Sequence, residues 1–198
     1  QGGMVGPCRI AYGTVSAAGT IVRKDQVQPD HLVFGGMGKE GRVPWKPGKL
    51  GGSVRIIRNN IYYIGNLFAL RHWYDQVRRP FISPRFPEEL HAGLLQTLDQ
   101  GLNERVHRLR LFIEGLNMVK LARAWEAVEV AWSDRAKERG HGALRDTFLD
   151  QLASLRRTGH GAYLETIQAL PPESAAIGTQ WLTSIVDEIV TSGLPMEN

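Results

Sequence analysis

The sequence predicts a mainly α-helical protein: a C-terminal helical bundle of five or six helices, preceded by a terminal β-helix coil. After residue 53, apolar residues recur at steps of three and four, which is the spacing of a buried helix face. Before residue 35, glycine and aliphatic residues recur at a step of six, which fits neither a helix nor an ordinary strand. We therefore expect a coil at 1–34, a Gly/Pro-rich connection at 35–53 and the bundle at 54–198.

The six-residue repeat begins at Met4 and reads MVGPCR, IAYGTV, SAAGTI and VRKDQV. The first places hold Met4, Ile10, Ser16 and Val22, and the fifth places of the first three hexads hold the small residues Cys8, Thr14 and Thr20. Gly6, Gly13 and Gly19 fall in the turn positions between these places. A parallel β-helix needs this pattern, because each face takes one inward aliphatic residue and one small residue, and the backbone turns sharply at each corner. Ser16 breaks the aliphatic rule, so a chance pair of Gly-rich strands stays open as the alternative.

A single coil cannot bury its own face, because a solenoid gains a continuous core only when about three repeats stack. We therefore expect further coils to precede this one and regard the chain as the C-terminal piece of a longer protein. The missing N-terminal region would then be its first partner.

Residues 4–36 resemble the closing coil of left-handed β-helix, or hexapeptide-repeat, transferases. "AYGTVSAAGTIVRKD" matches their last turn, and "HLVFGG" resembles the exit strand, although the usual Asn-Pro after its glycine is missing. With its basic Gly/Pro tail and long continuation, the chain is most similar to proteins related to UDP-N-acetylglucosamine pyrophosphorylase. The resemblance implies the end of a sugar-nucleotide transferase, a homotrimer, and a bundle that serves assembly or interaction. It supplies no catalytic residue, because the nucleotide-binding loop of that family has no match here.

The same resemblance also leaves an acyl-CoA-dependent acyltransferase open. In such relatives, backbone amides of small residues and a following basic side chain meet the cofactor, and the matching residues here are Ala17, Ala18, Arg23 and Lys24. The alternative is that the two basic residues only solvate the end of the coil. His31 lies beyond the last coil, and we expect it to be a loop residue and not a base.

The connection at 35–53 holds nine glycines and prolines in nineteen residues. This composition excludes a helix and disfavours a central strand. We expect an ordered connection anchored by Trp45. A phosphate-binding loop is excluded, because Leu50 stands where its motif requires a hydroxyl residue.

The first helix is expected after Ser53 as the N-cap. One stripe of this helix holds Ile57, Ile61, Ile64, Phe68, His72 and Val77. Further apolar residues such as Tyr62, Leu70 and Trp73 widen the stripe and predict burial on several sides.

The later helices follow from periodicity and from breakers. Residues 88 to about 132 keep an apolar period throughout, which predicts one long helix bent at Gly115, or two end to end. Two similar loops, "GHGALRD" and "GHGAYLE", predict boundaries at about 140 and 159. A last helix should begin after Pro171-Pro172 and end at Gly193. The paired histidines of the loops would suggest a metal only if the loops met, so we expect no metal.

Charge and composition limit the function further. Residues 1–85 hold 13 Lys/Arg against 4 Asp/Glu, and residues 86–198 hold 11 against 16. The basic half suits self-association or solvation, and also phosphorylated ligands or nucleic acid. The nucleic-acid alternative, which we favour less, would use Arg55, Arg58, Arg71, Arg78 and Arg79 with Tyr62, Trp73 and Tyr74.

Compartment and redox state follow from what the sequence lacks. No apolar run approaches the ~20 residues of a membrane span, and no signal peptide is apparent. The single cysteine, Cys8, can form neither an internal disulfide nor a cysteine-based zinc site. We therefore expect a cytoplasmic protein without membrane contact.

Overall fold

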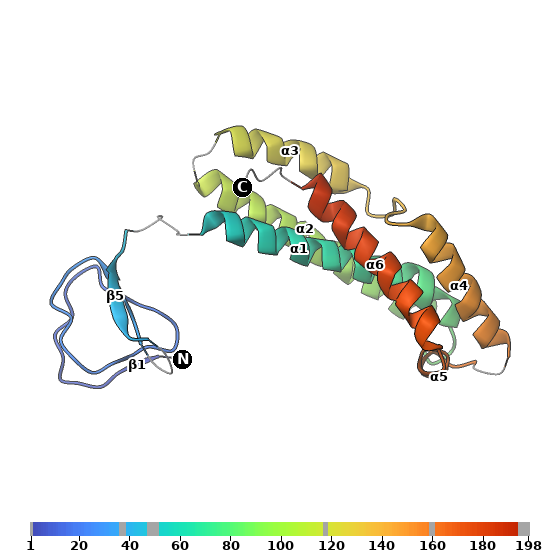
Figure 1. Ribbon diagram of the computed structural model, residues 1–198, viewed down its shortest axis with the longest axis horizontal. Coiled ribbons are helices and arrows are strands. Elements are labelled where there is room, and N and C mark those ends of the chain that lie inside the picture. The colour runs from blue at the N-terminus through green and yellow to red at the C-terminus, as the bar shows by residue number, and fades with distance from the viewer. Residues whose placement is uncertain (1, 36–38, 47–51, 117–118, 159–160, 194–198) are drawn as a thin grey trace. The chain divides into compact units, whose positions relative to one another are not determined.

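A computed structural model describes residues 2–35, 39–46, 52–116, 119–158 and 161–193. The chain divides into two compact units, Gln1–Gly51 and Gly52–Asn198 (Figure 1). We call them the β unit and the helical unit, and each is described by itself. Their division falls inside the connection expected at 35–53.

The β unit is built from short strands. They are β1 (Gly3–Met4), β2 (Val15–Ser16), β3 (Ile21–Val22), β4 (His31–Phe34) and β5 (Gly41–Pro44). In one sheet β1 pairs with β3, and in the other the order is β2, β4, β5. The β1–β3 and β2–β4 pairs are parallel, whereas β5 runs antiparallel to β4.

The parallel pairs join segments that are separated by nearly constant lengths of chain. Gly3 pairs with Ile21 and Val15 with Leu32, and an isolated parallel bridge joins Ile10 to Gln26, so partners are 18, 17 and 16 residues apart. The chain thus returns beside itself after about three hexads. The predicted exit strand, β4, is therefore a second pass of the chain laid in parallel beside the first.

Few side chains of the β unit are buried. Val22 is only 7 % exposed, and Thr20 and Val33 are buried with it. The hexad pattern also predicts inward positions for Met4 and Ile10, and this prediction is wrong in the described chain, because their side chains are 64 % and 38 % exposed. They lie in the first pass, and the second pass covers only one side of it.

The Gly/Pro-rich connection contains one strand that the sequence did not predict. β5 lies at the edge of its sheet, where Pro44 and the exposed Arg42 do not interrupt a ladder on both sides. Trp45 is half-buried, and its backbone N–H donates to the Asp30 carbonyl oxygen at 2.7 Å. Leu50 lies outside the described residues.

The helical unit begins with α1 (Ser53–His72), which continues through a π-helical segment η1 (Trp73–Arg78) and a 3-10 turn η2 (Arg79–Phe81). The predicted stripe is confirmed: all six residues from Ile57 to Val77 that it contains are buried. The N-cap is Gly52, in a left-handed conformation with φ 79°, and not Ser53. The expected burial on further sides is wrong for Tyr62 and Leu70, which are 45 % and 42 % exposed.

The long apolar run after residue 88 folds as two helices. These are α2 (Glu88–Gly115) and α3 (Val119–Ser133), and α3 turns back beside α2 (Figure 1). The expectation of two helices with a break at Gly115 is confirmed, whereas the single long helix and the end-to-end arrangement are wrong. The period persists because both helices of the hairpin bury a stripe in the same core, so periodicity alone does not mark the turn.

Three more helices complete the unit, α4 (Gly142–Arg157), α5 (Tyr163–Gln168) and α6 (Pro172–Ser192). The predicted boundaries near 140 and 159, and the last helix between Pro172 and Gly193, are confirmed. α6 lies along α1, and Gly65 permits this close approach, because a Cβ there would lie 3.1 Å from Val186 Cγ1. With six α-helices in the described residues, the chain is mainly α-helical, as predicted.

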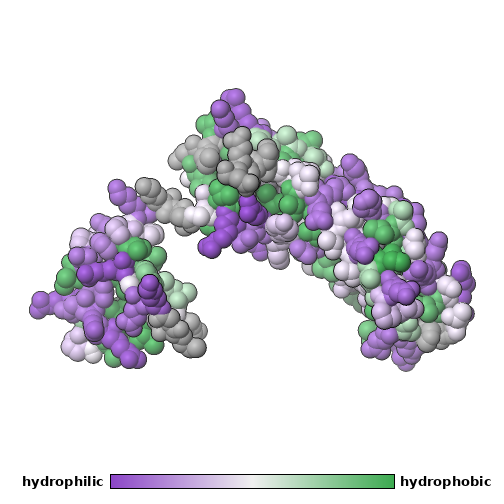
Figure 2. Space-filling model, viewed as in Figure 1, coloured by the Kyte–Doolittle hydropathy of each residue, from purple (hydrophilic) through white to green (hydrophobic). Residues whose placement is uncertain are grey.

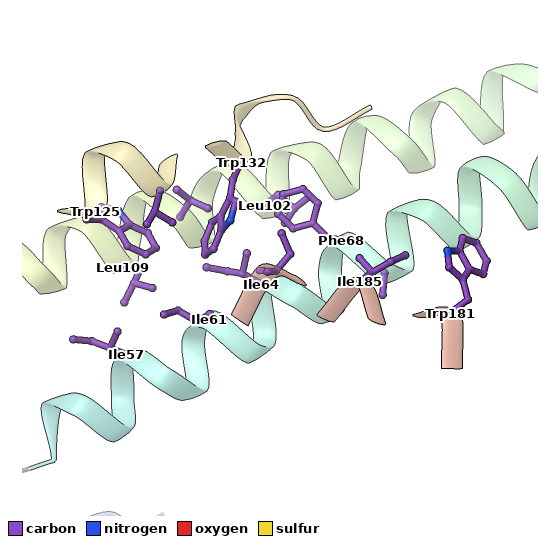
Figure 3. Packing of buried hydrophobic residues seen from close by; sticks show 14 of the residues in the cluster. Ile57, Ile61, Ile64, Phe68, Leu102, Leu109, Trp125, Trp132, Trp181 and Ile185 are labelled. Carbon is purple, nitrogen blue, oxygen red and sulfur yellow. The ribbon is translucent and has the colours of Figure 1, made fainter. Parts of the chain in front are cut away.

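The core of the helical unit lies between α1, α2, α3 and α6, as Figure 3 shows in part, and α4 adds Phe148 and Leu152 to it. Trp132 forms its centre, with edge-to-face contacts to Phe68 at 6.3 Å and to Trp125 at 5.5 Å. Its indole N–H donates to Ser192 Oγ at 3.0 Å, so the buried polar atom is satisfied. None of the helices in the described ranges combines the length and the apolar character that crossing a membrane requires.

Candidate functional site

The cofactor site that the resemblance implies is only partly brought together. Arg23 and Lys24 are exposed and line a depression of the β unit together with Arg42. Ala17 and Ala18 do not line it, and the Ala17 N–H already donates to the Val33 carbonyl oxygen at 2.8 Å. That amide is therefore not available to a phosphate.

The same depression has mixed charge. Asp25 and Glu40 stand on its wall beside the three basic residues. Asp25 Oδ1 also accepts the Arg9 backbone N–H at 2.8 Å. Because carboxylates repel phosphate oxygens, this depression is a weak anion site.

The arginines of the nucleic-acid alternative do not form one surface. Arg71 is buried and paired with Asp99 at 2.7 Å, and Arg79 faces Asp75 at 3.8 Å. Arg55 and Arg58 lie in the first turns of α1, at the opposite end of that helix from Arg78. A 20-residue helix is about 30 Å long, so the free cations of this set are far apart.

The aromatic residues of that alternative also have other roles. Trp73 Nε1 donates to the Tyr163 hydroxyl oxygen at 3.0 Å, and Tyr74 is half-buried. Of these three aromatic residues only Tyr62 is exposed, and its exposed fraction is 45 %. The face that Figure 2 shows carries hydrophobic and hydrophilic residues interleaved over the helical unit, without one continuous stripe of either kind.

The loop histidines do not form a metal site in the described residues. His141 precedes the first turn of α4, and His160 lies outside the described ranges. Throughout the described part of the chain, no group of three or more His, Cys, Asp or Glu side chains is placed to hold a metal ion.

A polar cluster around the buried Arg139 ties the end of α3 to α6. Arg139 Nη1 donates to Glu188 Oε1 at 3.0 Å, and its Nη2 donates to the Ala131 carbonyl oxygen at 3.1 Å. Glu188 Oε2 accepts the Gly140 N–H at 2.7 Å. These bonds close the end of α3 onto α6, and Arg139 is buried, so the cluster has a structural role.

His72 lies buried near this cluster. Burial lowers its pKa below the ordinary value, and the positive charges of Arg71 and Arg139 lower the pKa further. Gln76 Nε2 lies 3.3 Å from His72 Nδ1. Both effects favour the neutral form of His72 inside the bundle.

A basic cleft that sequence reasoning missed lies where η1, η2, α4 and α5 meet. Three arginines from distant parts of the chain line it, Arg78, Arg85 and Arg156. Arg78 is held between two rings, with its Cζ 4.2 Å from the Phe86 centroid and 3.8 Å from the Tyr163 centroid. We call this feature the arginine cleft.

Local structure explains how the arginine cleft is built. Ser83 and Phe86 exchange both backbone hydrogen bonds, at 3.0 and 2.9 Å, and this tight turn presents Arg85. Phe86 is buried edge-to-face against His91, whose Nε2 lies 2.9 Å from the Tyr74 carbonyl oxygen. The signal in the sequence was the alternation of basic and aromatic residues in "RRPFISPRF", but Arg156 and Tyr163 join the cleft only through the fold.

The described residues thus form two candidate binding sites. One is the positively charged arginine cleft of the helical unit, and the other is the depression of mixed charge in the β unit. No family model matches the chain, and comparisons with curated proteins and with solved structures find no match.

Proposed function

We propose that the β unit is the end coil of a left-handed β-helix, and that the chain acts as the C-terminal part of a hexapeptide-repeat transferase. By the resemblance of residues 4–36, the parent would be a sugar-nucleotide transferase related to UDP-N-acetylglucosamine pyrophosphorylase. The helical unit would then serve assembly or interaction, and its trimer would form through the missing coils.

The observation that carries this proposal is the set of three parallel pairings at separations of 16 to 18 residues. Short sequential strands normally pair antiparallel through hairpins, because a parallel pair needs a crossover connection. Three parallel pairings of nearly equal separation between two successive passes of the chain, without an intervening helix, are typical of a solenoid in which each coil holds three hexads.

The first pass of the chain supplies a second argument. β1 and β2 each lie at the end of their sheet, so one side of each has no partner strand among the described residues. Met4 and Ile10 are exposed on this pass although the hexad pattern places them inward. A preceding coil would pair with these strands and cover these side chains.

The acyl-CoA alternative has less support. Of its four residues, Ala17 has its amide engaged, and Arg23 and Lys24 share their depression with two carboxylates. The nucleic-acid alternative needs a continuous basic surface, whereas its arginines are divided between ion pairs and the two ends of α1.

A chimera tests the proposal. Residues 2–34 would replace the last coil of a trimeric left-handed β-helix transferase, and the chimera should keep the trimeric mass and the activity of the host. Ile10→Asp should abolish trimer assembly in the chimera, because Ile10 then lies between coils. Arg23→Gln is the matched control and should have no effect, because Arg23 is exposed. Failure of the unmutated chimera to form trimers would contradict the proposal.

A titration of the intact chain with acetyl-CoA tests the alternative. Saturable binding that Arg23→Gln and Lys24→Gln weaken, and that Arg157→Gln in the helical unit leaves unchanged, would favour the acyltransferase. A flat titration supports the end-coil proposal without a cofactor in this part of the chain.

A further inference from the structure

We propose that the arginine cleft of the helical unit binds the phosphate group of a small ligand. This inference is independent of the end-coil proposal, because every residue that lines the cleft belongs to the helical unit.

The charge of the cleft is the first argument. Arg78, Arg85 and Arg156 line it, and none of the described residues that line it is acidic. Within the described ranges, none of these three arginines takes part in an ion pair or donates a side-chain hydrogen bond. Three uncompensated cations in one hollow focus a positive field and attract an anion.

The arrangement of the arginines is the second argument. Stacking between Phe86 and Tyr163 restricts the guanidinium of Arg78, which reduces the side-chain entropy that binding would otherwise cost. Arg156 Cζ lies 5.6 Å from the Phe81 centroid, and Phe81 in turn packs edge-to-face on Tyr163 at 5.4 Å. Two of the three cations are therefore positioned by one connected aromatic cluster.

The chemistry of the cleft favours phosphate over other anions. A guanidinium makes two parallel hydrogen bonds to phosphate or to carboxylate, but three cations match the charge of a dianion better than that of a single carboxylate. The positive surface is also local, because many other arginines of the helical unit are neutralised. These pairs are Arg79–Asp75, Arg108–Glu104, Arg110–Glu129 and Arg145–Glu138. A polymer such as RNA would need a longer basic track.

Titration of the intact chain with inorganic phosphate and with pyrophosphate, in a phosphate-free buffer at low ionic strength, tests the proposal. The reporter is the Trp73 indole resonance in a ¹H–¹⁵N spectrum, because this N–H donates to Tyr163 at the cleft. We expect saturable binding, tighter for pyrophosphate than for phosphate. Uridine monophosphate distinguishes the source: tighter binding than phosphate indicates a phosphorylated organic ligand, and equal binding indicates free phosphate.

Two variants and a matched control locate the site. Arg85→Gln and Arg156→Gln remove exposed cations and should each weaken pyrophosphate binding about tenfold, the loss expected for one charged hydrogen-bonding group. Arg157→Gln removes the neighbouring exposed charge from the same last turn of α4, outside the cleft lining, and should change binding less than about twofold.

Three results would overturn the proposal. The first is the absence of saturable binding of either phosphate probe. The second is equal weakening by Arg156→Gln and Arg157→Gln, which would indicate only the general charge of the helix end. The third is a lack of selectivity for a small phosphate. Acetate that binds as tightly as phosphate would show it, and so would mixed oligonucleotides whose binding Arg55→Gln and Arg156→Gln weaken equally.

Discussion

The β unit and the helical unit bury their apolar residues to very different extents. In the β unit the buried hydrophobic side chains are Val22 and Val33, whereas the helical unit buries a continuous cluster from Ile57 to Ile189 that includes three tryptophans. The β unit also leaves Met4, Ile10, Ile21 and other large hydrophobic residues exposed. The helical unit therefore closes a core of its own, whereas the short strands of the β unit leave most of their apolar side chains in contact with solvent.

The largest difference should appear when one large hydrophobic residue is truncated in each unit. Trp132→Ala should lower the free energy of unfolding of the helical unit by about 3–5 kcal/mol, because it removes a fully buried ring that contacts Phe68 and Trp125. Ile21→Ala in the β unit should cost less than about 1 kcal/mol, because that side chain is 47 % exposed. Urea unfolding followed by circular dichroism measures the first, and exchange of the Gly3 and Val5 amides measures the second.

Two glycines with the same backbone conformation make a closer comparison. Gly140 and Gly19 have φ of 77° and 79°. Gly19→Ala should cost about 1 kcal/mol from backbone strain alone, because nothing lies within 4 Å of the added Cβ. Gly140→Ala should cost about 3 kcal/mol, because strain is joined by a clash at 2.6 Å with Ser184 Oγ and at 2.7 Å with Ile185 Cγ1. Equal losses in the two variants would show that the surroundings of Gly140 yield easily.

The helical unit should also respond to pH through His72. The pKa of buried His72 is lowered below 6.5 in the folded protein, so the unfolded chain binds more protons in the range between the two pKa values. The contribution of His72 to the free energy of unfolding is therefore fully present above pH 6.5. It is lost as the pH is lowered through that range, by at most about 1.4 kcal/mol per pH unit. Urea unfolding at pH 7.5, 6.5 and 5.5 should show this slope, and His72→Gln should reduce it. His107→Gln is the control, because His107 is exposed.

The smallest effect on stability should come from substituting Met4 and Ile10, the exposed residues at the first places of the first two hexads. Met4→Gln and Ile10→Gln should each change the stability of the β unit by less than about 0.5 kcal/mol in this chain, because neither side chain is buried. Exchange of the Ala11 and Ala17 amides, which donate to Gln26 and Val33, reports on it. A large loss of amide protection would mean that the Met4 and Ile10 side chains are covered in solution.

Much of the helical unit could be predicted from the sequence, because its signals are local. The stripe from Ile57 to Val77 follows from the helical period, and the boundaries near 140, 159 and 172 follow from Gly and Pro. The reversal of the chain between α2 and α3 could not be predicted in the same way, because Gly115 marks a break but not the direction of the next helix, and both helices keep the same apolar period. Exposure of Tyr62 also escaped prediction, because its apolar ring suggests a wider buried stripe although the residue lies beside that stripe and not on it.

The candidate sites depend on contacts that a local pattern does not contain. The pairing of Met4 with Val22 agrees with the spacing of the hexads, but the engagement of the Ala17 amide by Val33 depends on how β4 returns beside β2. The arginine cleft is harder still to predict from the sequence, because Arg78 and Arg156 are far apart in the sequence and meet only after α4 and α5 have packed.

The antiparallel strand β5 forms an outer edge of the β unit that is unsuited to pairing with a further strand. Pro44 has no N–H to offer to a further strand, and Arg42 places a charge on the same outer edge. The strands β1 and β2, which end the two sheets on the other side, contain the exposed Met4 and neither a proline nor a charged residue. β5 therefore closes the outer edge of its own sheet, where a proline and a charged residue oppose the edge-to-edge aggregation to which open sheets are prone.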